Sequence, residues 1–493
     1  MPVLDDLTSL RPALLGLVAA LSLSACAGGD APGGSPNQSL ATGSVAVLMT
    51  DAPTDDFCHI YATVESIDLL GASGPTSVFD GPETTVDLLA MRNYSDFFAI
   101  DTAVPIGRYQ KVRLTLSDLA LVECGDDGVP EDAAGWEHPH LPGNGKMDLS
   151  PRGTFEVIGG ETLVIELDLD MNKSLHVHQT GNGRWQFRPV IFVTIRPNDS
   201  KLVRVFGEVR NLGTTAFELC PLEPASSSGP GGPAVPAAEC IDVATDANTG
   251  IFDETGSPVG LSAVANGEPL TAVGFLSLHD DPDGDSRMDD LLLNAAVLEL
   301  GPNETFERIR GAVVSAPGNN DLFEFDGAPL DPAGMFDVLL QSGTRIFALG
   351  SNEELTSAAL QPGTRGEVDG VFTDPPTSGE PLKSSLVVLD QDATPDASIL
   401  GATIDTIATD DDAVPETRRL TVDAGTLLDQ CVKTDAATRY LLITESATAS
   451  ETTEIAFADL AVGNSVDVYG AADPAEPTTC VLADTIQKYV AAP

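Results

Sequence analysis

The chain has 493 residues, 42% of them hydrophobic, and its 75 acidic and 25 basic side chains give a formal net charge of −50. This length exceeds what one hydrophobic core supports and predicts about three or four domains. The hydrophobic content excludes a disordered acidic tail, and the charge argues against nucleic acid and anionic membrane surfaces as partners. We interpret the charge mainly as a source of solubility, with binding of cations or of a basic partner as alternatives.

The amino-terminal residues predict export. An apolar run over residues 13–23 is too short to span a bilayer, and Ser-Ala and then Cys26 follow it. This pattern resembles the lipobox of bacterial lipoproteins, in which the matching cysteine, here Cys26, is acylated and the preceding peptide, here residues 1–25, is removed. Because Ala27 and not aspartate follows Cys26, the resemblance implies an outer-membrane lipoprotein. An ordinary signal peptide with an incidental cysteine is the alternative. Residues 26–43 predict a flexible tether.

Residues 44–198 predict an antiparallel β-sandwich. The run Val45 to Met49 is continuously apolar, as in a buried strand, and residues 163–170 alternate in a way typical of a half-buried strand. The last strand, residues 185–196, contains Pro189, which indicates an edge position or a bulge. Several such short strands separated by turns are typical of a sandwich.

The same segment resembles a known family. The stretch GSVAVLMTDAPTDD at residues 43–56, together with residues 86–89, 107–109 and 181–190, resembles the bacterial lipoprotein domain family DUF4382. No activity is established for that family. The resemblance therefore implies a cell-envelope context and no mechanism.

Three divergent copies of one unit follow, at residues 202–302, 306–392 and 398–490. Each opens with a strand (203–209, 306–313 and 398–404) and carries a later strand that ends in glycine (270–274, 366–370 and 465–470). A period near ~95 residues is too long for a solenoid and fits serial small domains. The glycine pattern resembles the DUF5666 module, which implies a small barrel, and glycine there would permit tight strand curvature. The predicted fold class is therefore all-β: a sandwich followed by three β-barrel-like repeats.

The cysteines other than Cys26 fall into pairs along the chain. In an exported protein such a set predicts disulfides within each domain. No C-x-x-C spacing occurs, so the sequence gives little support for a redox or zinc role. The predicted pairs are Cys58–Cys124, Cys220–Cys240, which would close a Ser/Gly/Pro-rich insertion, and Cys431–Cys480.

Two features suggest metal binding, each with a plainer interpretation that we favour. The first is two H-x-H pairs, which could supply imidazoles to Zn²⁺ or Cu²⁺ if they converged; the plainer interpretation is two exposed pairs that never meet. The second is an acidic loop with carboxylates spaced like a Ca²⁺ loop, although glycine falls at position four and Leu292 occupies position twelve. A solvated hairpin tip is its plainer interpretation. The residues are His138, His140, His176 and His178, and Asp281, Asp283, Asp285 and Asp289.

Two smaller features remain. Asp51, Asp55 and Asp56 form a second acidic turn, in which aspartate chiefly suits turn geometry and Ca²⁺ binding is the alternative. Trp136 is expected to pack within its loop, with exposure for ligand stacking as the alternative. We expect no resident cofactor.

No sequence motif predicts catalysis. The chain lacks G-x-S-x-G, H-E-x-x-H and a phosphate-binding loop. We therefore expect a non-catalytic binding or scaffold protein, held to the membrane by its lipid, with a protein or glycan partner. A metal-binding envelope protein is the first alternative and an envelope hydrolase the second.

Overall fold

The computed structural model describes most of the chain after residue 41. The chain divides into residues 1–39, which lie outside the described residues, and residues 40–493. No described helix is long and apolar enough to cross a membrane. The described ranges are 42–51, 57–91, 94–123, 135–151, 153–177, 185–196, 201–221, 240–279, 290–318, 320–327, 334–372, 379–390, 396–409, 418–425, 430–445, 450–476 and 480–491.

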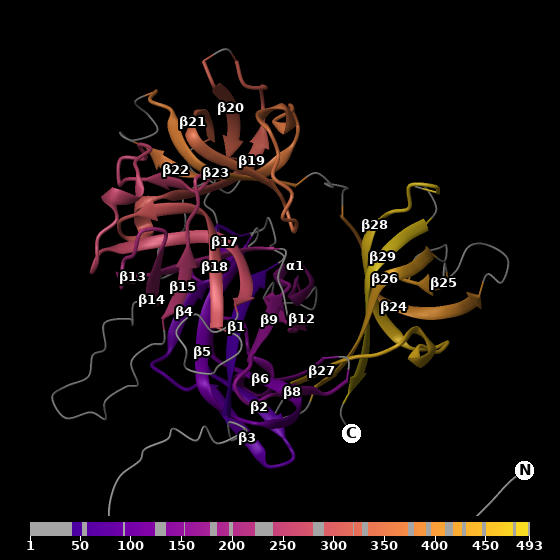
Figure 1. Ribbon diagram of the computed structural model, residues 1–493. Coiled ribbons are helices and arrows are strands. Elements are labelled where there is room, and N and C mark those ends of the chain that lie inside the picture. The colour runs from indigo at the N-terminus through magenta and orange to yellow at the C-terminus, as the bar shows by residue number, and fades with distance from the viewer. Residues whose placement is uncertain are drawn as a thin grey trace, which may run out of the picture. The chain divides into compact units, whose positions relative to one another are not determined.

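Two sheets form the amino-terminal sandwich (Figure 1). Strands of the first, in spatial order, are β12 (Ile191–Arg196), β9 (Thr162–Leu169), β1 (Thr42–Asp51) and β5 (Ser95–Pro105). Strands of the second are β7 (Lys146–Ser150), β6 (Gly107–Val122), β2 (His59–Gly71) and β3 (Gly74–Phe79), with β4 (Thr84–Asp87) beside β2 and β8 (Phe155–Val157) beside β6. One apolar cluster draws side chains from both sheets, including Val47, Ile60 and Leu114.

The first sheet differs from the antiparallel sandwich that we predicted, because β1 pairs with β9 in parallel. Parallel strands are normally buried on both faces, and this holds here. Val45 and Val47 face the sandwich core, whereas Ala46, Leu48 and Val164 join a second cluster with residues of the first repeat. The prediction that residues 163–170 form a half-buried strand is therefore wrong.

Short elements connect these strands. A single turn of helix, α1 (Met171–Ser174), follows β9, and Asp170 caps it by accepting a hydrogen bond from the Lys173 N–H. The hairpin β10 (Leu175–Val177) and β11 (Trp185–Phe187) comes next. The described residues of this segment include the 3₁₀ turns η1 (Leu88–Met91) and η3 (Pro142–Gly145).

Each repeat forms a ring of strands. The first contains β13 (Leu202–Arg210), β14 (Ala216–Pro221), β15 (Ile241–Ala244), β16 (Gly250–Phe252), β17 (Pro269–His279) and β18 (Asp290–Leu300), with η4 (Leu261–Ala263) before β17. The second contains β19 (Glu307–Val313), β20 (Leu322–Gly327), β21 (Gly334–Ala348), β22 (Arg365–Phe372) and β23 (Leu382–Asp390), with η6 (Ser357–Ala359) before β22 and η5 (Asn303–Thr305) preceding the repeat. The third contains β24 (Asp396–Thr409), β25 (Arg418–Asp423), β26 (Gln430–Glu445), β27 (Ser450–Glu454), β28 (Ser465–Ala472) and β29 (Cys480–Ala491), with η8 (Phe457–Asp459) before β28.

All three rings share one connectivity. In the second repeat the order is β19-β20-β21-β23-β22, closed by pairing of β22 with β19. The β21–β23 contact is parallel and the others are antiparallel. The corresponding pairings recur in the first repeat and in the third. The all-β class with small barrels is confirmed.

Glycine permits the same bend in each barrel. At Gly274, Gly370 and Gly470 a Cβ atom would lie 2.1, 2.4 and 2.1 Å from a backbone oxygen of the neighbouring strand. The strand register shifts at each of these glycines, as at a β-bulge. The expectation that these glycines allow barrel curvature is confirmed.

The sandwich sheets continue into two repeats. β5 pairs in parallel with β13 through Ser95 and Asp96, and β7 pairs in parallel with β27 through residues 147–150. Strand pairing therefore joins the amino-terminal segment to the first and third repeats.

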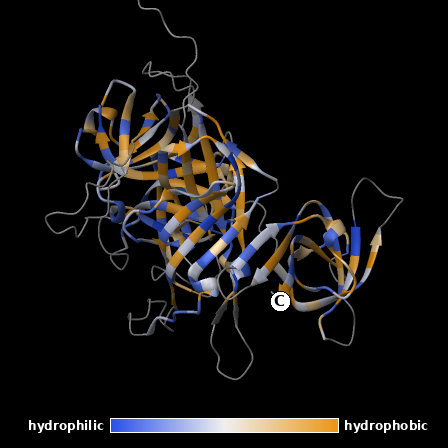
Figure 2. Ribbon diagram, turned by 90° about the horizontal axis from the view of Figure 1, so that it is seen from below, coloured by the Kyte–Doolittle hydropathy of each residue, from blue (hydrophilic) through white to orange (hydrophobic). Residues whose placement is uncertain are grey.

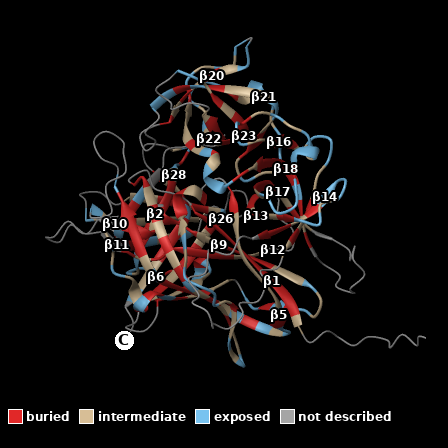
Figure 3. Cartoon of the chain, turned by 90° about the vertical axis from the view of Figure 1, so that its left-hand side faces the viewer, coloured by how far each residue is buried: buried red, intermediate tan, exposed pale blue. Residues whose placement is uncertain are grey.

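Along the strands, hydrophobic and hydrophilic positions alternate (Figure 2). Buried positions follow the strands, whereas exposed ones gather in the turns (Figure 3).

Candidate functional site

A buried acidic cluster lies where β1 and β9 end. Asp51 is the last residue of β1, and the parallel register places Asp168 opposite Thr50, with Asp170 two residues further on. Asp51 and Asp170 are 3% and 2% exposed. The Met171 N–H donates to Asp51 Oδ1 (2.9 Å), and Lys173 Nζ donates to Asp170 Oδ2 (2.5 Å). Asp51 of the T-D-A-P opening is thus an interior carboxyl group at the end of a strand.

Burial shifts the protonation of this cluster. It raises the pKa of Asp51 well above its ordinary value, and the charges of Asp170 and Asp168 add to the effect against the Met171 hydrogen bond. It also raises the pKa of Asp168 to about 6, with help from the charge of Asp170 and opposition from Lys201. Burial therefore makes both carboxyl groups bind a proton at a higher pH than an exposed aspartate does.

A second buried network joins the sandwich to the first two repeats. Arg204 of β13 donates to both carboxylate oxygens of Asp96 (2.8 and 3.0 Å) and to the Ala90 carbonyl (2.8 Å). Its guanidinium lies 4.9 Å from the ring centre of Tyr94. The Tyr94 hydroxyl in turn donates to Asp369 Oδ1 of β22 (2.7 Å), and both of these side chains are 0% exposed. These contacts therefore connect Arg204 of the first repeat, through Tyr94 of the sandwich segment, to Asp369 of the second repeat.

Carboxyl groups crowd the far side of this network. Ser385 Oγ lies 2.5 Å from Glu299 Oε1 and 3.1 Å from the Asp369 carbonyl oxygen, and Arg308 lies 4.0 Å from Glu299 Oε2. Burial, followed by the charges of Glu299 and Glu367, raises the pKa of Asp369 well above its ordinary value. Burial likewise raises the pKa of Glu299, against the charge of Arg308. Buried carboxyl groups that face one another disfavour ionisation of both.

An open cleft of about 550 Å³ is lined mainly by residues of the third repeat, together with Gly153 of the amino-terminal segment. Its lining includes Tyr440 and Phe457, whose rings meet edge to face at 5.8 Å, and Arg418, which lies 4.6 Å from the Phe457 ring centre. Asp435, Glu454 and Asp459 also line it. The cleft combines an apolar floor with more negative than positive charge.

The amino-terminal segment, which forms the sandwich, matches a known family model. Residues 42–189 match the family model described as Domain of unknown function (DUF4382). The resemblance expected from the T-D-A-P opening is confirmed for this segment, and the DUF4382 segment contains the acidic cluster as well as Tyr94 and Asp96. No curated protein matches the chain. A solved structure described as "drosophila Unr CSD456" aligns with 59% of this chain and 98% of its own at 10% identity, with a TM-score of 0.17, which supports no inference.

The histidine pairs of the DUF4382 segment are only partly described. His138 Nδ1 lies 2.9 Å from Asp118 Oδ1, both side chains being about half exposed, and His140 is exposed. His176 lies in β10 opposite Gln186, its side chain is outside the described residues, and so is His178. Convergence of the pairs on Zn²⁺ or Cu²⁺ stays a prediction.

Both acidic turns also fall largely outside the described residues. This applies to Asp281, Asp283, Asp285 and Asp289, and to Asp55 and Asp56. Ca²⁺ binding there stays a prediction. Trp136 is half-buried, and its ring lies 5.3 Å from that of Tyr61 in β2, so it packs against a strand and not only within its own loop.

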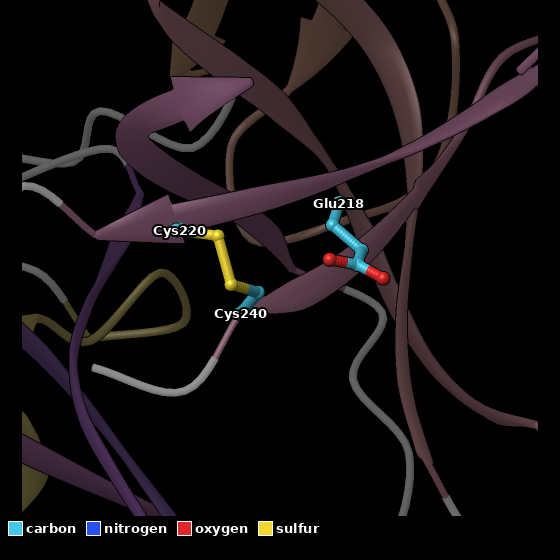
Figure 4. A group of neighbouring side chains, drawn as sticks. All are labelled: Glu218, Cys220 and Cys240. Carbon is cyan, nitrogen blue, oxygen red and sulfur yellow. A yellow bond between two sulfur atoms is a disulfide. The ribbon is translucent and has the colours of Figure 1, made fainter. Parts of the chain in front are cut away.

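The structure contains two of the predicted disulfides, Cys220–Cys240 and Cys431–Cys480. Cys58 is also disulfide-bonded, and its predicted partner Cys124 lies outside the described residues. In the described part of the chain, the side chains spaced closely enough to share a metal ion are Glu218, Cys220 and Cys240 (Figure 4). Because both sulfurs are in the disulfide, they offer no thiolate ligand. The carboxylate beside this bridge was not predicted from the sequence.

Proposed function

We propose that this chain is a lipid-anchored, non-catalytic binding or scaffold protein of the bacterial cell envelope. The observation that carries the proposal is the continuous joining of modules: β5 pairs with β13, β7 pairs with β27, and Tyr94 bonds to Asp369. Modules held by strand pairing and buried hydrogen bonds suit a protein that presents surfaces in a fixed arrangement. The lipobox-like sequence ending at Cys26 supports the anchor.

The cleft of the third repeat is the binding surface that we propose. Among the described lining residues, three carboxylates outnumber one cation, Arg418, which disfavours an anionic ligand, and the rings of Tyr440 and Phe457 contribute apolar surface. A hydroxyl-rich glycan or a basic protein segment fits these groups, because carboxylates accept hydrogen bonds from both. We also propose that the three repeats are DUF5666-like modules, on the strength of their recurrent glycine pattern and shared connectivity.

Metabolic labelling with palmitate tests the anchor. We expect label in the full chain, none in Cys26→Ala, and normal labelling of the control Ser24→Ala, which keeps a small residue before the cysteine. Labelling of Cys26→Ala equal to wild type would overturn the localisation. Turnover of ester, peptide or glycan substrates by the purified protein would overturn the non-catalytic assignment.

A further inference from the structure

One of the two described disulfides carries an arginine against both of its sulfur atoms. Cys431 of β26 lies directly opposite Cys480 of β29 in the parallel pairing. From the adjacent β25, Arg419 places Nε 3.1 Å from Cys431 Sγ and Nη2 3.0 Å from Cys480 Sγ. A guanidinium in this position stabilises negative charge on either sulfur.

Other charged groups hold the guanidinium in place. Arg419 Nη2 also donates to Glu476 Oε2 at 2.7 Å, and Lys433 donates to Glu476 Oε1 at 3.0 Å and to Asp473. Hydrogen bonding from Lys433 lowers the pKa of Glu476 and of Asp473, so both carboxyl groups are ionised at neutral pH. Glu476 Oε2 lies 3.4 Å from Cys480 Sγ and partly offsets the guanidinium. Arg419 makes the shorter contacts and touches both sulfurs.

The other disulfide has the opposite electrostatic surroundings. A carboxylate oxygen of Glu218 lies within 4.8 Å of both Cys220 Sγ and Cys240 Sγ (Figure 4). A carboxylate there opposes formation of a thiolate. The two bridges are otherwise alike in accessibility, since each joins a buried cysteine (Cys220 3% exposed, Cys480 4%) to a half-buried one. The Cys220–Cys240 bridge therefore serves as an internal control for the Cys431–Cys480 bridge.

We propose that Cys431–Cys480 is a site of thiol–disulfide exchange with a dithiol reductant. The thiolate of the reductant attacks Sγ of Cys431, the more accessible cysteine, and forms a mixed disulfide as the Cys431–Cys480 bond breaks. The electron pair of that bond leaves on Cys480 Sγ, where Arg419 Nη2 stabilises the thiolate. The second thiolate of the reductant then attacks its own sulfur in the mixed disulfide and releases Cys431 as a thiolate beside Arg419 Nε. The reductant loses two electrons and becomes a disulfide, and the cysteines take up protons from water.

Exchange would change how β26 is held. The bridge lies where β26 runs from Cys431 to Thr434 between β25 and β29, before a register shift that separates this segment from the part of β26 beginning at Arg439. Reduction removes the covalent link between β26 and β29 and leaves backbone pairing alone. Asp435 and Tyr440, which line the cleft, follow Cys431 along the same strand, β26, so the exchange site and the proposed binding surface share one strand.

The test follows the order of reduction in the purified, oxidised full chain. Dithiothreitol is added, samples are quenched with acid, free thiols are alkylated, and peptide mapping by mass spectrometry assigns each bridge. We expect Cys431–Cys480 to open several-fold faster than Cys220–Cys240. Arg419→Gln should slow its opening about threefold or more, since the leaving thiolate departs more slowly as its pKa rises.

Two further variants make the result decisive. Lys488→Gln removes one positive charge from the same repeat, where Lys488 Nζ donates to the Asp459 carbonyl oxygen, and should leave the rate unchanged. Glu218→Gln should speed opening of Cys220–Cys240 and does not depend on the folding of the Arg419 variant. Equal rates for the two bridges in wild type, or an Arg419→Gln rate equal to that of wild type, would overturn the proposal.

Discussion

Replacing Tyr94 by phenylalanine tests the buried network that links the DUF4382 segment to the second repeat. The change removes one hydroxyl, which donates to Asp369 Oδ1 at 2.7 Å, and keeps the ring beneath Arg204. Asp369 Oδ2 has no hydrogen-bond partner within the described ranges, so the variant leaves both side-chain oxygens of a fully buried carboxyl group without a donor. Leaving a buried polar group unsatisfied costs about 1–3 kcal/mol.

Native-state hydrogen exchange measures this loss of stability at the amides of β22, the strand that carries Asp369. We expect the opening free energy of β22 amides to drop by about 1–3 kcal/mol in Tyr94→Phe. The matched control is Tyr109→Phe, whose hydroxyl donates to the Pro105 carbonyl within the sandwich and should leave β22 unchanged. In a cycle with Asp369→Asn, the two changes should be non-additive because the residues are in contact. Protection of β22 equal to wild type in Tyr94→Phe would refute the view that this network stabilises the junction.

Two other predictions concern the acidic cluster and the barrel glycines. The folded pKa of Asp168 is about 6 and its ordinary value is 3.8. Between these values the folded state binds more protons than the unfolded state, so the free energy of unfolding falls as pH rises through that window. The loss is at most about 3 kcal/mol, and it is smaller because Asp168 keeps some exposed surface. Urea unfolding at pH 4.5 and 7 should show a smaller pH dependence for Asp168→Asn, and an unchanged dependence would count against the assignment. Gly470→Ala would place a Cβ 2.1 Å from the Leu482 carbonyl oxygen and should destabilise the third barrel by about 1–3 kcal/mol. The control Ser465→Ala, at the exposed start of β28, should change the melting temperature of that barrel little. Equal effects of the two substitutions would contradict the steric argument.

Local pattern predicted much of the fold, and long-range pairing did not follow from it. Alternation and glycine placement indicate strands and tight bends, so the all-β class and the barrel glycines were predictable. Alternation carries no information on strand direction, which is why the parallel contact of β1 with β9 was missed. The alternation predicts a solvent-exposed polar face for residues 163–170, yet Glu166 of β9 and Asp170, which follows the strand, are buried.

In the candidate sites too, local sequence features could be predicted and contacts between distant residues could not. The pairwise placement of the cysteines along the chain predicted the two described bridges. Arg419, however, contacts Cys480 across 61 residues, and only the strand pairing of the barrel brings them together. The link from Tyr94 to Asp369 spans 275 residues and has no local signature. The aspartate of the T-D-A-P opening was interpreted as a turn residue because the strand that buries it lies more than a hundred residues away.

Scanning calorimetry of the full chain tests the joined-module account most directly. The sandwich shares strand pairing and apolar clusters with the repeats, so we predict that the sandwich and the first and third barrels unfold in one transition, with a van't Hoff enthalpy close to the calorimetric enthalpy. Separate transitions for the sandwich and these barrels would contradict the account.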